Sequence, residues 1–96
     1  MSDLASVRVI VFGSVQSVYF RDFARRRAVE LGLTGYARNL RQAEAVEVEA
    51  EGERGQLVTL ISHLKVGPPA ARVTNVVTDW SEYTKRYSDF EIRGLA

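Results

Sequence analysis

The stretch Gly13-Ser14-Val15-Gln16-Ser17-Val18-Tyr19-Phe20-Arg21 joins a predicted strand to a predicted helix. Residues 7–12 before it form a β-branched run of strand length, and apolar residues at 20, 24, 28 and 31 repeat at helical spacing. A short loop of this kind points backbone N–H groups and the positive end of the helix dipole toward one place, so it predicts an anion site. Gly13 predicts a sharp turn at the strand end. Arg21 in the first helical turn fits a bound anion, and equally fits the start of a solvated helix face.

Length and composition indicate one globular domain. The chain has 96 residues, of which 46% are hydrophobic and 26% charged, and we expect a single domain over 1–96 with a core at about 6–94. The net charge of +1 gives no broad attraction to nucleic acid. There are no cysteines, which excludes disulfides and a cysteine nucleophile. Without a leader-like or membrane-length apolar stretch, we expect a cytoplasmic protein with no membrane contact, working as a monomer.

The order of predicted elements specifies the fold class. Strands are expected at 7–12, 33–40, 46–51, 71–78 and 89–93, with helices at about 21–31 and across the apolar stripe at 57, 60, 61 and 64. Gly32 caps the first helix, and residues 52–55, 41–44 and 80–88 are expected as turns or loops. The order βαββαβ predicts an α+β, ferredoxin-like split βαβ sandwich. Its antiparallel four-stranded sheet would have both helices on one face and a short fifth strand.

The third strand alternates, with Glu47, Glu49 and Glu51 on the face opposite the core. We expect this face to be exposed, because spacing of two is typical of a solvated sheet surface. A metal site on these glutamates is disfavoured for the same reason. The βαββαβ topology also occurs in RNA-binding sheets, but negative charge on the open face argues against RNA.

Asn39 is the polar residue expected near the loop after the first strand, at the end of the second strand. Its amide can donate and accept hydrogen bonds, which would suit the orientation of a water molecule. Taken alone, Asn39 is explained better as a turn-forming asparagine before a hairpin. The single His63 has no catalytic partner at informative spacing.

Two motifs in this order resemble the signatures of the acylphosphatase family. Residues 13–21 resemble Gly-x-Val-Gln-Gly-Val-x-Phe-Arg, and Gly35-Tyr36-Ala37-Arg38-Asn39 resembles the second signature at every position. Further likenesses extend over nearly the whole chain, at 31–33, 46–47, 51–52, 67–68 and 90–93.

The resemblance implies a hydrolase that splits acyl phosphates into carboxylate and inorganic phosphate, without cofactor, metal or covalent intermediate. Carried over to this chain, Arg21 would bind the phosphate and Asn39 would orient the attacking water. The backbone amides of the loop would complete the phosphate site, from residues Ser14, Val15, Gln16, Ser17, Val18, Tyr19 and Phe20. The partners would be the small-molecule substrate and inorganic phosphate, with no nucleic acid; the physiological acyl phosphate is not specified.

The chain departs from the family pattern at two places. Ser17 replaces the second glycine of the first signature, and a positive φ there would cost roughly 1 kcal/mol. The hairpin after Asn39 lacks the usual Asp-Gly turn and is one residue longer, which predicts a looser turn. An alternative is therefore a catalytically weakened module that binds phosphate or a carbamoyl phosphate group.

Overall fold

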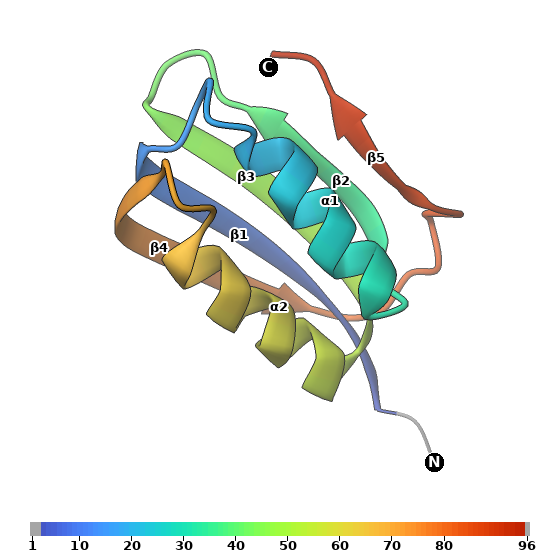
Figure 1. Cartoon of the computed structure of the whole chain (residues 1–96). Helices are drawn as coiled ribbons and strands as arrows, with labels where there is room; N and C mark the ends of the chain where they lie inside the picture. The colour runs from blue at the N-terminus through green and yellow to red at the C-terminus, as the bar shows by residue number, and fades with distance from the viewer. Residues whose placement is uncertain (1–2, 96) are drawn as a thin grey trace.

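The computed structural model describes residues 3–95. The chain forms, in order, β1 (Leu4–Ser14), α1 (Phe20–Glu30), β2 (Thr34–Asn39), β3 (Ala45–Glu53), α2 (Arg54–Val66), β4 (Arg72–Ser81) and β5 (Phe90–Arg93). The strands make one five-stranded sheet in the order β4-β1-β3-β2-β5, and both helices cover the same face (Figure 1). This is the predicted ferredoxin-like α+β sandwich. Within the described residues, neither helix is long and apolar enough to span a membrane.

The short fifth strand makes the sheet mixed. β1 pairs antiparallel with β3 and β4, and β2 pairs antiparallel with β3, whereas β5 pairs parallel with β2. β5 therefore extends the sheet next to the strand that ends in Asn39, and it reaches the same end of the molecule as the β1–α1 loop (Figure 1).

The core lies between the sheet and the two helices. The alternate valines of β1 and β3 and the apolar stripe of α2 are buried there, as the sequence pattern predicts. The α1 side of the same cluster comes from Phe20, Ala24 and Ala28. Because Phe20 is the first residue of α1 and only 1% exposed, core packing fixes where the helix begins.

Several predicted boundaries differ from the structure, and β1 begins at Leu4 rather than at residue 7. β1 does not end at Gly13: the strand continues through a bulge, with Gly13 at φ 134° and so close to β4 that a Cβ would lie 2.0 Å from the Arg72 carbonyl oxygen. β4 extends past its predicted end because Trp80 pairs with Val7 and packs on the core. The predicted turn at 52–55 is absent, because β3 continues to Glu53 and α2 begins at Arg54.

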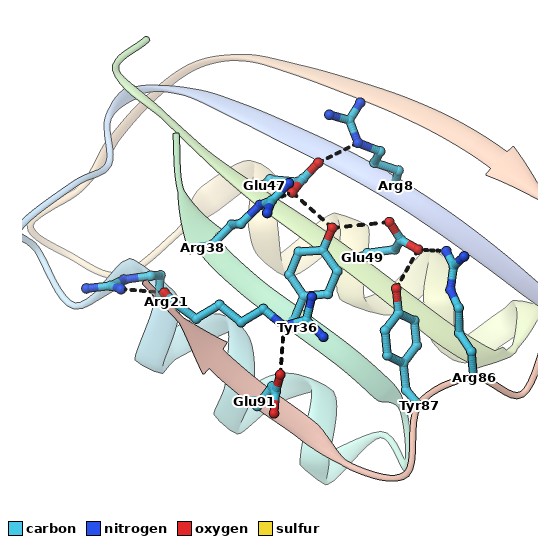
Figure 2. Close-up of polar contacts among 10 residues, drawn as sticks. Arg8, Arg21, Tyr36, Arg38, Glu47, Glu49, Arg86, Tyr87 and Glu91 are labelled. Atoms are coloured by element: carbon cyan, nitrogen blue, oxygen red, sulfur yellow. Dashed lines mark hydrogen bonds and ion pairs between the residues drawn. The ribbon is translucent and has the colours of Figure 1, made fainter. Parts of the chain in front are cut away.

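The prediction that Glu47, Glu49 and Glu51 are exposed is wrong, since they are 1%, 9% and 1% exposed. Long side chains on the flanking strands and on the β4–β5 connection (residues 82–89) lie across Glu47 and Glu49 (Figure 2). Glu47 accepts hydrogen bonds from Arg8 and Arg38, each at 2.5 Å. Because these glutamates are buried, the sheet face does not carry the exposed negative charge that was expected to disfavour RNA.

The β4–β5 connection is held to the other two glutamates. Glu49 accepts a hydrogen bond from the Tyr87 hydroxyl at 2.6 Å and is ion-paired with Arg86. Glu51 accepts hydrogen bonds from the backbone N–H of Thr84 at 2.9 Å and from its hydroxyl at 2.7 Å. This polar layer attaches the segment before β5 to the centre of the sheet.

Burial and hydrogen bonding shift two pKa values in this layer. Burial alone would raise the pKa of Glu47, but hydrogen bonds from Arg8, Tyr36 and Arg38 outweigh it and lower the pKa below its usual 4.5. Burial, followed by the hydrogen bond to Glu47, raises the pKa of Tyr36 above 10.0. Glu47 is therefore ionised and Tyr36 neutral at pH 7.

Candidate active site

A cavity of roughly 380 Å³ lies where the β1–α1 loop meets the ends of β2 and β5. The loop and the first turn of α1 supply most of the lining, Asn39 comes from the end of β2, and Ile92 comes from β5. The complete lining is Val15, Ser17, Tyr19, Phe20, Arg21, Asp22, Asn39 and Ile92. The two residues that the sequence singled out for chemistry, Arg21 and Asn39, thus share one cavity.

The loop has two left-handed residues, Ser17 at φ 62° and Tyr19 at φ 60°. Tyr19 is also the N-cap of α1, and its side chain makes no capping hydrogen bond. The first N–H groups of an α-helix have no partner within the helix, so they and the helix dipole make this end attractive to an anion. This geometry is suited to an anion, and anion binding by the loop stays a prediction.

The Gln16 side chain connects the β1–α1 loop to the β2–β3 hairpin through hydrogen bonds. Its Nε2 lies 2.9 Å from the Leu40 and Ala45 carbonyl oxygens and 3.2 Å from that of Ala43. The anchor points flank the turn that directly follows Asn39, so one side chain sets the position of the loop relative to that residue.

Arg21 points along the helix terminus toward β5. Its Nη1 donates a hydrogen bond of 2.9 Å to the Arg93 carbonyl oxygen, as the dashed line in Figure 2 marks. One turn further along α1, Arg25 donates to the Phe90 carbonyl oxygen at 3.2 Å. The parallel edge strand is therefore held against α1 by two arginines. Arg21 keeps further N–H groups with which a guanidinium can bind an anion.

The predicted loop residues divide into two groups. Val15, Ser17, Tyr19 and Phe20 line the cavity, whereas Ser14, Gln16 and Val18 do not. Ser14 pairs with Arg72 as the last residue of β1, Gln16 contacts the hairpin, and Val18 packs against the core. The side chains of Gln16 and Val18, and the strand pairing of Ser14, therefore hold the loop in place without lining the cavity.

Sequence reasoning missed two lining residues, Asp22 and Ile92. Asp22 follows Arg21 directly and could have been placed in the first turn of the helix. Ile92 could not have been placed without knowing that the last strand pairs parallel with β2, because an antiparallel edge strand would run the other way past Asn39.

The arrangement can bind a tetrahedral dianion. A guanidinium and backbone N–H groups at a helix N-terminus would face its oxygens, and a side-chain amide lies on the same cavity wall. The fold and the cavity together define an α/β sandwich in which the predicted anion-binding loop joins the first strand to the first helix.

Comparisons with known proteins show the family to which this α/β sandwich belongs. The acylphosphatase family model matches residues 7–92. An acylphosphatase from Dehalococcoides mccartyi is 51% identical over 87 residues, covering 91% of this chain and 96% of that protein. The structure of an acylphosphatase from Coxiella burnetii superposes with a TM-score of 0.88 at 41% identity, covering 95% of this chain and 94% of the other. The chain belongs to the acylphosphatase family.

A further similarity is to part of a larger protein. Full-length HypF, in its phosphate- and nucleotide-bound form, matches with a TM-score of 0.87 at 28% identity. That match covers 99% of this chain and 12% of HypF. Since the D. mccartyi and C. burnetii proteins match over almost their whole length, this chain is similar in size to the stand-alone acylphosphatases.

Proposed function

We propose that this protein hydrolyses acyl phosphates to a carboxylate and inorganic phosphate. The observation that carries the proposal is the single cavity that Arg21 and Asn39 line together with the N-terminus of α1. Membership of the acylphosphatase family supports the same reaction. The weakened binding module is not favoured, because the proteins that match over their full length are acylphosphatases.

In the proposed mechanism, Arg21 and the loop amides bind the phosphoryl oxygens and neutralise charge in the transition state. Asn39 holds a water molecule in line with the leaving carboxylate. The water oxygen forms a bond to phosphorus, the phosphorus bond to the acyl oxygen breaks, and the carboxylate leaves with its electron pair. The protons of the water remain on the phosphate product, so no side chain needs to act as base. Acyl phosphates have a good leaving group, and positioning supplies most of the remaining catalysis.

The direct experiment measures hydrolysis of benzoyl phosphate by the purified protein, with a metal chelator present and inorganic phosphate added at increasing concentration. We expect turnover that the chelator does not change and that phosphate inhibits competitively. Phosphate binding without turnover would contradict the proposal and favour the weakened binding module.

The oligomeric state and the location in the cell belong to the proposal as predictions. We propose a monomer that works in the cytoplasm on a small-molecule substrate, without nucleic acid as a partner. Light scattering during gel filtration measures the mass directly, and a dimer at micromolar concentration would contradict the first part.

A further inference from the structure

Tyr19 is the most exposed large side chain at the cavity. It is 84% exposed, and no described residue forms a hydrogen bond with its hydroxyl. Its backbone is also left-handed, at φ 60°, which is a conformational outlier for a bulky residue. Left-handed non-glycine residues cluster at ligand sites, where the surrounding structure maintains the strain. Neither core packing nor helix capping accounts for a tyrosine here.

Ile92 lies on the β5 side of the same cavity and is 42% exposed. Val15 and Phe20, both 1% exposed, form the buried apolar part of the lining. The cavity thus combines an anion-binding loop with an apolar surface between α1 and β5. The Tyr19 ring and the Ile92 side chain lie around the apolar floor that Val15 and Phe20 form. Such a surface is suited to a planar or aliphatic group.

The charges at the cavity indicate which groups would fit. Among the described residues that line it, Arg21 is the only cation, and the proposed function assigns it to the phosphate. Asp22 is the only carboxylate in that lining, and Arg26 neutralises it across 3.3 Å. In this described lining, an acyl group with a second negative charge would therefore meet no cation other than Arg21.

We propose that Tyr19 and Ile92 form an acyl-binding surface, and that the protein prefers acyl phosphates whose acyl group is uncharged and aromatic or extended aliphatic. This inference rests on the proposed function, in which the phosphate end of the substrate occupies the loop. The acyl end then leaves the loop between α1 and β5, where the aromatic ring covers it. Covering a phenyl group rather than a methyl group favours the larger substrate by roughly 10-fold or more.

The test compares the binding of two non-hydrolysable analogues, benzoylphosphonate and acetylphosphonate, by calorimetric titration. The variants are Tyr19→Phe, which keeps the ring, and Tyr19→Asn, which removes it with a residue that tolerates left-handed backbone. Val29→Ala is the matched control, because Val29 is an exposed apolar residue in the last turn of α1. We expect the wild type, Tyr19→Phe and Val29→Ala to bind benzoylphosphonate at least ~10-fold more tightly, and Tyr19→Asn to lose most of that preference.

Equal binding of the two analogues by the wild type, or an unchanged preference in Tyr19→Asn, would overturn the inference. Because binding is measured without turnover, these results are separate from a failure of the proposed function, which would appear as absent hydrolysis of benzoyl phosphate. A Tyr19→Asn protein that loses the preference but unfolds at the wild-type temperature would exclude a general structural effect.

Discussion

At the scale of single residues, the loop maintains left-handed backbone at Ser17 and Tyr19, where each residue costs about 1–2 kcal/mol. Contacts on both sides fix this geometry. The Val15 N–H bonds to the Gly13 carbonyl oxygen at 3.0 Å, Gln16 is held by the hairpin, and the Phe23 N–H bonds to the Tyr19 carbonyl oxygen at 2.9 Å. Ser17 therefore adopts the positive φ expected of the glycine that it replaces.

Ser17→Gly tests whether this serine weakens the site. Glycine relieves the strain but gives the unfolded chain more freedom, so we expect the free energy of unfolding to change by less than about 1 kcal/mol. Hydrolysis of benzoyl phosphate should change by less than roughly threefold, because the backbone already has the required conformation. A gain of 10² or more in kcat would instead show that the chain has drifted away from catalysis.

The sequence predicted that Arg21 and Asn39 lie in one site, but it did not predict the side-chain contacts that position the loop. Arg21 and Asn39 could be predicted as neighbours because each lies at the end of an element that the topology brings to one edge. The side chain of Gln16 could not be placed, since its carbonyl partners belong to a turn whose conformation the sequence does not specify.

At the scale of elements, the position of β5 depends on side-chain contacts in addition to its backbone pairing with β2. Arg21 and Arg25 hold it from α1, and the polar layer on β3 holds the connection that precedes it. The alternation of Glu47, Glu49 and Glu51 along β3 correctly predicted that their side chains share the sheet face opposite the core. It could not show that side chains of β1, β2 and the β4–β5 connection bury them, because that contact is set by sheet order and loop path.

Glu47→Gln tests the contribution of the buried carboxylate on β3. The folded-state pKa is below 4.5, so its stabilising effect is complete above about pH 4.5 and is lost as the pH falls through the folded-state pKa. We expect the variant to lose about 1–3 kcal/mol of unfolding free energy at pH 7. Urea unfolding at several pH values should show this deficit shrinking toward acid pH.

The matched control for that experiment is Glu30→Gln. Glu30 forms an exposed ion pair with Arg27 at the end of α1, and exposed pairs contribute less than about 1 kcal/mol. A deficit of Glu47→Gln that is as small as the control's, or one that does not change with pH, would mean that Glu47 is not a stabilising carboxylate.

At the scale of the whole molecule, one sheet and two helices share one core, and the site is formed where its separate elements meet. The βαββαβ order and right-handed connections were enough to predict this architecture. The direction of β5 could not be predicted, because it depends on the path that residues 82–89 take across the sheet. Trp80 was predicted to lie in the connection before β5, but it belongs to β4.

The prediction of a single domain over the whole chain has a direct test in equilibrium unfolding. Trp80 packs against the core from β4, so its fluorescence reports tertiary packing, while far-ultraviolet circular dichroism reports helices and strands. For one cooperative domain, the two urea transitions should coincide. Two separated transitions would contradict a single domain.

The roles of Arg21 and Asn39 are best tested by steady-state kinetics on the wild type, Arg21→Ala, Asn39→Ala and the control Arg27→Ala. The experiment determines kcat, KM and the phosphate inhibition constant for each protein. Arg21→Ala should lower kcat/KM by at least ~10²-fold and weaken phosphate inhibition, because it removes the charge that binds the phosphoryl group. Asn39→Ala should lower kcat while phosphate inhibition stays near the wild-type value, and Arg27→Ala should match the wild type. An unchanged rate in Arg21→Ala, or loss of phosphate inhibition in a folded Asn39→Ala protein, would contradict the roles assigned here.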